Sequence, residues 1–553
     1  MENRKGKREK GMRLAPCGAA GALLLLFSIF SFPFSALAGT FYISSSLGSD
    51  SRTSTQAQSK TTPWAHAPGM KNWTGSYIPA AGDRFIFYGG DTWTVASFQW
   101  GITWSGTSTQ QIYFGADSTW FNAGVCGASW CRPIFDFQNT IVSSTCSVWT
   151  CAGVWVQASY ITIDNIEFLH FELPNANIRG QYRADQIHGP DTGGGQTDTG
   201  DIIENCLFKD WGMEGTVAPG TSADLGQAGV DGGFSGTNAL QFIGNTIDDQ
   251  NGSSGSPTTA CYTGSGIAAG YITKNNVCEH TNNCFGVGIP GTLFEGNIIH
   301  DMYLSTDTAS GSDTGNHENQ IYGKCWGYYI GNVVYNTPAG ATLQLYPASY
   351  CQIAGQTFYT ANNMFDMTGS YSQCWVDRGA WDFYHYNDTC KTPGAFSYFS
   401  RSSGGSGCPN SIHITNAQVI IDSYAGTTAP QSTSSTGASI TAFANVDNGC
   451  STAVSVTTSV AQSTAAANAQ GYSLSNGWQP SSGSNASVGK GTNETALCMG
   501  SLAPLCSALN YLNPILPGTA RPASGAWDVG AYQFGVPMLH PAIPPSNLML
   551  SAH

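Results

Sequence analysis

Short apolar strands alternate with polar turns along this chain, and one phrase keeps returning. The phrase is an apolar pair, an asparagine, a second apolar pair and a polar turn. Its asparagines are Asn165, Asn205, Asn245, Asn276, Asn297, Asn332, Asn363 and Asn416, and a further copy is centred on Asn387. Repeats of a few dozen residues indicate a solenoid or a related array. Each unit is β-branched and aromatic and ends in Gly, Asn, Asp or Thr, which predicts strands rather than helices.

A strand this short cannot bury its apolar face alone, so stacked copies are needed to build a continuous core. An asparagine at the same point of each copy can occupy a left-handed bend. Its side-chain amide can then bond to the asparagines above and below it. The pattern therefore predicts an all-β fold, a parallel β-helix. Long Gly/Asp/Thr-rich stretches at 174–201, 212–238, 250–265 and 303–320 are expected as insertions on one face.

Three segments outside the repeats resemble known proteins. The stretch 39–51 resembles the first strand, 78–95 an early coil, and 518–534 the terminal coil of secreted bacterial proteins of the pectate-lyase-like superfamily. The resemblance implies a right-handed parallel β-helix, with a closing strand at 527–534. It is specific for the fold and much less so for the chemistry, because function lies in sites grafted onto folds.

The chain is expected to divide into four parts. Residues 1–38 read as a signal peptide, in which a basic start and an apolar run end in an A-x-A cleavage site at Ala36–Ala38. Residues 39–425 are expected to form the β-helix with its N-terminal cap. Residues 426–534 combine a Ser/Thr/Ala-rich segment with the terminal coil, and 535–553 form an extended tail. We expect a protein that is secreted, with the cell surface as a second location, and no membrane span in the mature chain.

Cysteine usage agrees with export. Beyond residue 38 the chain keeps an even number of cysteines, which suggests disulfides in an oxidising compartment. Close pairs are Cys126/Cys131, Cys146/Cys151, Cys278/Cys284, Cys374/Cys390 and Cys498/Cys506, and these are expected to staple loops rather than hold the core.

Charge limits the partners. The formal net charge is −14, and only 10% of residues are charged. Nucleic acid is excluded as a partner, since phosphate binding needs a basic stripe. An extracellular polysaccharide is the expected partner, bound by a monomer. An acidic polymer would need a local basic cluster or a bridging Ca²⁺.

The densest polar cluster runs from residue 300 to 324, between two recognisable repeats. β-Elimination of an acidic polysaccharide needs a base, together with a cation such as Ca²⁺ held by carboxylates. In the enzymes that this chain resembles the base is usually Arg or Lys. The expected catalytic residues are Lys324, His317, Tyr322 and Arg378. The expected substrate-binding residues are Asn319, Trp326 and His300, and the expected Ca²⁺ ligands are Asp301, Asp307, Asp313 and Glu318.

Two alternatives to this polysaccharide lyase stay open. Glycoside hydrolysis needs two carboxyls flanking the bond, for which Asp248 with Asp249, or Asp301 with Glu318, are candidates. A surface adhesin or carbohydrate-binding module needs no catalytic group at all. No complete catalytic motif is present in the sequence, which favours this last reading.

Overall fold

The computed structural model describes residues 38–138, 151–173, 184–188, 199–213, 227–232, 240–248, 259–265, 271–281, 283–288, 290–302, 321–323, 325–337, 341–345, 357–368, 373–393, 397–400, 408–422, 444–446, 452–510 and 519–535. The chain divides into two compact units, Met1–Ala38 and Gly39–His553. All but one of the described residues belong to the second unit.

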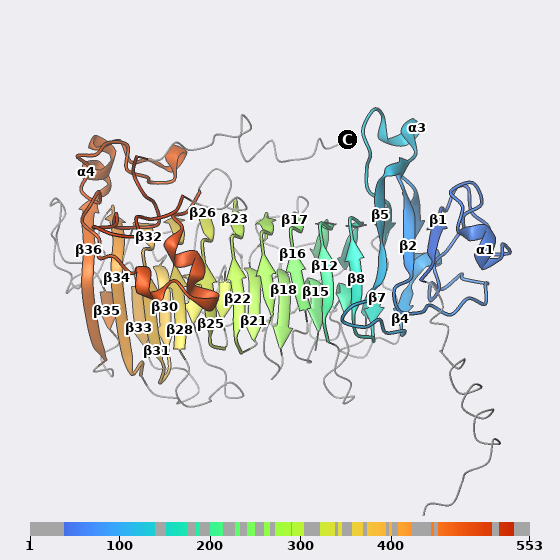
Figure 1. Ribbon diagram of the computed structural model, residues 1–553, viewed down its shortest axis with the longest axis horizontal. Coiled ribbons are helices and arrows are strands. Elements are labelled where there is room, and N and C mark those ends of the chain that lie inside the picture. The colour runs from blue at the N-terminus through green and yellow to red at the C-terminus, as the bar shows by residue number, and fades with distance from the viewer. Residues whose placement is uncertain are drawn as a thin grey trace, which may run out of the picture. The chain divides into compact units, whose positions relative to one another are not determined.

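The second unit is a stack of coils with three strands per coil (Figure 1). Each strand pairs in parallel with the equivalent strand of the next coil, so three ladders run along the stack. We call them faces 1, 2 and 3 in chain order. Faces 1 and 2 form one 23-stranded sheet, because the long strands β34 (Ser411–Ile421) and β36 (Ala453–Ser463) run through both. Face 3 is a separate 11-stranded sheet.

The ladders have the following members. Face 1 contains β1 (Thr40–Ile43), β2 (Arg84–Gly89), β5 (Ile112–Phe121), β8 (Ile161–Asp164), β12 (Asp201–Glu204), β16 (Leu240–Ile243), β19 (Ile272–Lys274), β22 (Thr292–Glu295), β25 (Gly327–Ile330), β28 (Thr357–Ala361) and β31 (Asp382–Tyr386). Face 2 contains β3 (Thr92–Thr94), β6 (Ile134–Asp136), β9 (Glu167–Leu169), β13 (Leu207–Lys209), β17 (Thr246–Asp248), β20 (Val277–Glu279), β23 (Ile298–His300), β26 (Val333–Thr337), β29 (Met364–Met367) and β32 (Thr389–Thr392). Face 3 contains β4 (Trp100–Ile102), β7 (Cys151–Val156), β11 (Ala184–His188), β15 (Gln227–Gly232), β18 (Thr259–Ser265), β21 (Asn283–Gly288), β24 (Ile321–Gly323), β27 (Ala341–Leu345), β30 (Gln373–Arg378), β33 (Ser397–Ser400) and β35 (Ala444–Val446).

The remaining elements are short. A two-stranded sheet pairs β10 (Phe171–Leu173) with β14 (Trp211–Met213). The α-helices are α1 (Ser54–Ala57), α2 (Val95–Phe98), α3 (Ala123–Cys126) and α4 (Thr464–Ala469), and the 3₁₀ helices are η5 (Leu474–Asn476), η6 (Thr495–Leu497) and η7 (Gly500–Cys506). Among the described residues no helix is long and apolar enough to cross a membrane.

The core fills the inside of the coils. Inward positions of successive strands repeat large apolar side chains, and these stack on one another, as Phe168 does on Phe208 with ring centroids 5.2 Å apart. The inward and outward positions alternate along each strand, as the pleat requires. The predicted parallel β-helix is thereby confirmed. Three strands, β11, β15 and β18, lie inside stretches that we expected to be insertions, because the Gly-, Asp- and Thr-rich composition of these stretches hides the strand signal.

The turn from face 1 to face 2 uses two residues with different tasks. The first has positive φ and is Asn or Gly, as in Asn165 (φ 57°) and Gly296 (φ 67°). The second is buried and, in the middle coils, is an asparagine that bonds to its neighbours: Nδ2 of Asn276 donates to Oδ1 of Asn297 (2.9 Å), and Nδ2 of Asn297 to Oδ1 of Asn332 (3.0 Å).

The asparagine ladder is therefore real, but our grouping merged the two positions. Asn165, Asn205, Asn387 and Asn416 occupy the left-handed first position of the turn rather than the second, although Asn387 and Asn416 are buried there as well. An asparagine suits both positions, so the repeated letter could not separate them.

The C-terminal segment covers the last coils from outside. The alternating stretch at 454–462 lies within β36, the last strand. After α4 the chain folds back, and the buried Trp527 and Leu505 pack against Ile330, Ala361 and Tyr386 of face 1. Residues 519–535 contain no strand, so the expected closing strand at 527–534 was wrong. Its apolar residues pack as a cover, and its one bridge, from Trp527 to Gly491, is isolated.

Three of the expected disulfides are present: Cys126–Cys131, Cys374–Cys390 and Cys498–Cys506. Cys374 and Cys390 are fully buried and join β30 to β32, so this bond holds the core, contrary to our expectation that it would staple a loop. Cys206 is free and buried, and burial raises the pKa of its thiol to about 12. Cys146 and the side chain of Cys284 lie outside what the structure describes, so the pairs Cys146/Cys151 and Cys278/Cys284 stay predictions.

Candidate functional site

Six of the expected site residues lie outside the part of the chain that the structure describes: Lys324, His317, Asn319, Asp307, Asp313 and Glu318. Tyr322 lies in the middle of β24 on face 3. Arg378 ends β30, on the same face, after the buried Asp377. Trp326 precedes β25 and packs against the core, with its ring 6.3 Å from that of Tyr328. The remaining two are His300, the last residue of β23 on face 2, and Asp301, which follows it.

His300 and Asp301 belong to a polar strip that crosses several coils. Strand register places Asp248, Glu279 and His300 at equivalent positions, each the last residue of its strand. The next residue in the later two coils, His280 and Asp301, has positive φ (56° and 51°) and turns its side chain back beside the strand ends. We call Asp248, Glu279, His280, His300 and Asp301 the acid–histidine strip.

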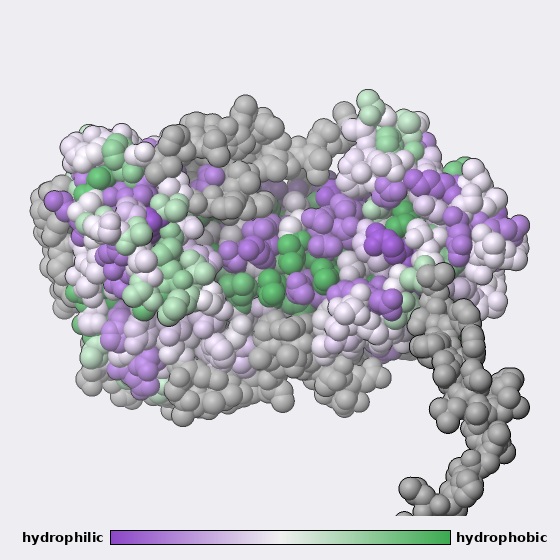
Figure 2. Space-filling view, viewed as in Figure 1, coloured by the Kyte–Doolittle hydropathy of each residue, from purple (hydrophilic) through white to green (hydrophobic). Residues whose placement is uncertain are grey.

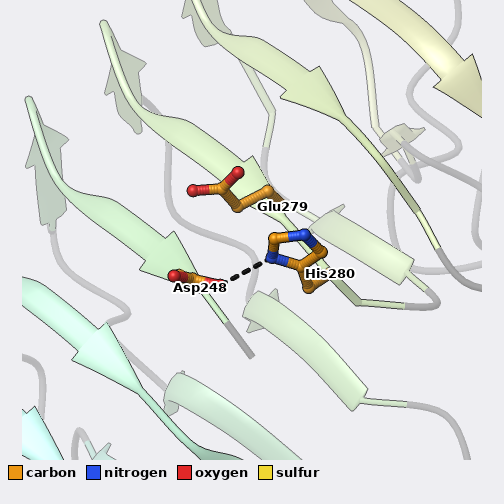
Figure 3. Close-up of side chains that lie close together, drawn as sticks. All are labelled: Asp248, Glu279 and His280. Carbon is orange, nitrogen blue, oxygen red and sulfur yellow. Dashed lines mark hydrogen bonds and ion pairs between the residues drawn. The ribbon is translucent and has the colours of Figure 1, made fainter. Parts of the chain in front are cut away.

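Two histidines connect the carboxyls of this strip. Nδ1 of His280 lies 2.7 Å from Oδ1 of Asp248, one coil away (Figure 3). Nδ1 of His300 lies 2.7 Å from Oδ2 of Asp301, while its Nε2 lies 3.6 Å from Oε2 of Glu279. One imidazole thus bridges a carboxyl of its own coil and one of the coil before.

The surroundings of these groups fix the histidines further. The ring of Tyr335 stacks on that of His300, with centroids 5.0 Å apart and an interplanar angle of 4°. The side-chain amide of Asn336 donates to Oδ1 of Asp301. An imidazole held by a ring on its face and a carboxylate on one nitrogen has a defined orientation, as a proton-transferring group needs.

The carboxyls of the strip differ in their protonation. Burial raises the pKa of Glu279, an effect that nearby His300 only partly offsets. The hydrogen bond from His300 holds the pKa of Asp301 down at about 2. The hydrogen bond to Asp248 raises the pKa of the His280 imidazole, which favours its charged form. Neighbouring groups whose pKa values are pushed apart are typical of acid–base sites, although structural ion pairs do the same.

The strip also offers ligands for a cation. Asp248, Glu279 and His280 form one group whose ligand atoms all lie within 4.8 Å of one another, and Glu279, His300 and Asp301 form another. Carboxylate oxygens are the donors that Ca²⁺ prefers, whereas imidazole nitrogens suit transition metals. Each group offers two carboxyls, whose donor chemistry fits Ca²⁺, and one imidazole.

A second, smaller pair continues the same edge toward the N-terminus. Nδ1 of His170 lies 2.9 Å from Oδ1 of Asp136, and its Nε2 lies 4.0 Å from Oδ2 of Asp210. His170 and Asp210 also have positive φ (56° and 48°), so they repeat the turn position of His280 and Asp301. The edge is therefore a row of Asp–His pairs rather than one isolated cluster.

Sequence reasoning found only the C-terminal end of this strip. Asp248 entered as a hydrolase candidate, but Glu279 and His280 were missed. They lie in a different repeat, and only the stacking of coils brings them to His300. The signal that could have found them is the alignment of the repeats themselves, which sets Asp248, Glu279 and His300 one above the other.

No protein-family model and no curated protein sequence matches this chain. Among solved structures, the chain is similar to a GH136 lacto-N-biosidase from Eubacterium ramulus (TM-score 0.46, 10% identity, covering 77% of this chain and 68% of that one). It is also similar to a rhamnogalacturonan lyase (TM-score 0.40, 12% identity, 74% and 87% coverage). A third likeness is to the Streptococcus pneumoniae surface protein and adhesin PfbA (TM-score 0.25, 8% identity, 69% and 91% coverage). At these values the similarities carry no argument about activity.

Proposed function

We propose that this protein is an extracellular polysaccharide lyase that uses the acid–histidine strip to cleave a uronic-acid polymer by β-elimination. The observation that carries the proposal is His300, an oriented imidazole between the ionised Asp301 and the buried Glu279. The strip lies at the strand ends of face 2, where Asp248 and Glu279 are buried and His280, His300 and Asp301 are part-exposed.

The reaction removes the proton next to the uronate carboxyl, breaks the glycosidic bond at the neighbouring carbon and leaves a carbon–carbon double bond. We assign proton removal to Nε2 of His300, since Asp301 occupies the other ring nitrogen. We assign proton donation to the leaving oxygen to His280, whose raised pKa favours the charged imidazole. The proton balance is complete, because one histidine takes a proton and the other gives one.

Glu279, which belongs to both groups of possible ligands, is the carboxyl that would hold Ca²⁺ beside these histidines. A bound cation would neutralise the substrate's carboxylate and so ease removal of the adjacent proton.

An extracellular location is part of the proposal. Three disulfides among the described residues and the signal-like start of the chain support it. The polysaccharide, the monomeric state and the identity of the sugar all remain predictions, which assays on the mature protein can test.

The test is incubation with a panel of uronic-acid polymers, in Ca²⁺ and in chelator, while the ultraviolet absorbance of the unsaturated product is followed. His300→Ala should abolish the signal. The matched control is His413→Ala, since His413 is also part-exposed but lies on face 1, bonded to Ser455 and Ser411. Equal loss in both variants, or an unchanged rate in His300→Ala, would remove the strip from the mechanism.

Hydrolysis on the same strip is the second candidate. It is favoured by one observation, the opposite pKa shifts of Glu279 and Asp301, which suit a general acid and an ionised partner. New reducing ends without absorbance of an unsaturated product would favour it over elimination. Neither signal on any polymer would favour a binding protein instead.

A further inference from the structure

A pocket lies on face 1 near the N-terminal end of the stack, away from the acid–histidine strip on face 2. Its volume is about 480 Å³, and its lining includes Tyr42, Arg84, Ile86, Asp117 and Trp130. In Figure 2 the surface over β2 and β5 is strongly hydrophilic, whereas the surface around β16 and β22 on the same face is apolar. This end of face 1 is therefore chemically distinct from the rest of the face.

The pocket exists because two strands depart from the coil pattern. β5 is ten residues long, and its pairing with β2 shifts register between Phe87 and Gly89. The chain beyond β5 forms a loop that the Cys126–Cys131 disulfide closes. Trp130 stands next to that disulfide, with the Arg132 guanidinium 5.8 Å from its ring centre. The long β5 and the loop closed by Cys126–Cys131 form one side of the pocket.

The floor of the pocket carries only small or buried side chains. Ile86 is buried, and the next coil carries Gly115 at the paired position. A Cβ at Gly115 would lie 2.6 Å from the backbone oxygen of Asp164, so only glycine fits there. The space above this floor is bounded by aromatic rings, which suit the C–H faces of a sugar.

Arg84 is the positively charged residue of the lining, which also contains Asp117. Its guanidinium lies 3.9 Å from the ring centre of Tyr113, and it forms no ion pair with any residue that the structure describes. The neighbouring carboxylates already have partners: Tyr113 donates to Asp164 (2.5 Å), and Lys60 pairs with Asp117 (3.2 Å). A stacked arginine keeps its planar donors pre-arranged for a carboxylate.

Charge supports the choice of ligand. Lys60 also lies over the ring of Tyr42, 5.7 Å from its centre, and its charge offsets that of Asp117, so Arg84 is the unpaired charge of the lining. The whole chain has only 21 Lys and Arg against 35 Asp and Glu. An unpaired arginine in a pocket of such an acidic protein favours an anion, and the rings of Tyr42 and Trp130 in the lining favour a sugar over an inorganic ion.

We propose that this pocket binds a uronate residue of an acidic polysaccharide, with Arg84 on the carboxylate and Trp130 and Tyr42 against the sugar ring. The inference shares with the proposed function only the class of ligand. It adds a non-catalytic binding site, which would hold the polymer on the protein at a second point and raise its effective concentration at the strip.

The test is affinity electrophoresis in gels containing polygalacturonate, alginate or hyaluronan, with dextran as the neutral control. We expect at least one uronate polymer, and not dextran, to retard the wild-type protein. Arg84→Ala should weaken that binding about tenfold or more, because it removes a charge-assisted bidentate contact. Arg84→Lys should recover part of it, since lysine keeps the charge but not the planar fork.

The matched control is Lys490→Ala, which removes the same charge from an exposed lysine in the C-terminal segment and should be retarded like the wild type. Trp130→Ala should weaken binding while Trp130→Tyr retains it. The inference would be overturned if Arg84→Ala were retarded as strongly as the wild type. It would also be overturned if no uronate polymer retarded the wild type.

The two proposals fail separately. Cleavage of a polymer without Arg84-dependent retardation would leave the lyase assignment standing and remove the pocket. Arg84-dependent retardation without cleavage would establish the pocket and remove the lyase assignment. The Arg84 variants can also be made in the His300→Ala background, so that cleavage of the polymer in the gel does not alter the measured retardation.

Discussion

Asn363 donates both its backbone N–H (2.8 Å) and its side-chain amide (2.9 Å) to a single oxygen of Asp388, Oδ1. Asp388 thus occupies the buried turn position that asparagines hold in the coils before it. Its other oxygen accepts from the hydroxyl of Thr360, which also contacts Nδ1 of His385 (2.9 Å). A carboxyl therefore ends the asparagine ladder inside the core, and burial raises its pKa to about 6.

We predict that Asp388→Asn stabilises the protein above pH 6. A carboxyl whose pKa rises from 3.8 to about 6 on folding contributes stability that is complete below pH 3.8 and is lost as the pH rises through 6. The loss is on the order of 3 kcal/mol at neutral pH. An asparagine keeps the acceptor for Asn363 and has no charge to bury.

Urea unfolding at several pH values measures this effect. The free energy of unfolding of Asp388→Asn should exceed that of the wild type at pH 7, and the difference should shrink toward pH 4. A less stable variant at pH 7 would mean that the carboxylate is the required form. Asp366→Asn does not serve as a control, because Asp366 accepts a hydrogen bond from Trp478 of the C-terminal segment and its replacement would disturb that contact.

A substitution in the middle of the asparagine ladder should instead destabilise the protein. Asn297→Ala removes the acceptor of two hydrogen bonds from Asn276 (3.0 and 2.9 Å) and the donor to the Thr273 carbonyl (3.0 Å). Each buried group left without a partner costs about 1–3 kcal/mol, so we expect a loss of roughly 3 kcal/mol or more.

The control for the ladder is Asn275→Gly, one residue before Asn276. Asn275 is in the left-handed position (φ 60°), which glycine adopts without steric cost. This variant should lie within about 1 kcal/mol of the wild type. Thermal unfolding of the two variants side by side tests whether the two turn positions have the separate tasks that the structure gives them.

The sequence was sufficient for the stack but not for its edges. Repeated apolar pairs predict coils because each strand is encoded by a few adjacent residues, and the asparagines mark the tight turn. The segment around Trp527 was expected to be a strand because it resembles the terminal coil of pectate-lyase-like proteins. Its partner is the outside of face 1 rather than another strand edge, and a pattern alone does not distinguish the two.

The candidate site shows the same limit. His300 and Asp301 are adjacent in sequence and could be found as a pair. Glu279 and Asp248 reach them only because each coil rises by one strand spacing, so residues of different repeats become neighbours. Arg84 and Trp130 were missed as a pair because a disulfide-closed loop, and not the repeat, brings Trp130 to the pocket.

Replacement of Asp248 by Asn should lower the pKa of His280. The hydrogen bond from its Nδ1 to Asp248 is the main cause of the raised value. Stabilisation by this pair is present below the unfolded value of about 6.5 and is lost as the pH rises through the folded pKa.

An NMR titration of the histidine ring protons measures the change directly. Asp50→Asn is the matched control, because Asp50 makes the same 2.7 Å contact with His66 in the N-terminal cap and does not touch the strip. An unmoved His280 titration in Asp248→Asn would contradict the assigned pairing.

Loss of the Cys126–Cys131 disulfide should weaken the pocket more than the fold. Replacing both cysteines by serine releases the loop that carries Trp130, while the three ladders keep their pairing. We expect weaker retardation by the uronate polymer and a moderate loss of stability, about 2 kcal/mol for so short a loop. The control is the double serine variant at Cys498–Cys506, a similarly short bridge in the C-terminal cover, which should keep wild-type retardation.

Two substitutions in the strip separate orientation from cation binding. Asp301→Asn keeps the shape but removes the carboxylate that accepts from His300, so we expect kcat to fall about a hundredfold with little change in KM. Glu279→Gln keeps His300 in place and removes a carboxylate from both ligand groups, so more Ca²⁺ should be needed for half-maximal activity. Calorimetric titration with Ca²⁺ provides a readout independent of turnover: Glu279→Gln should bind more weakly than the wild type, and His413→Ala should not. If Ca²⁺ binds both proteins equally, or neither, the cation does not belong to this strip, and the hydrolytic reading of Glu279 and Asp301 gains the advantage.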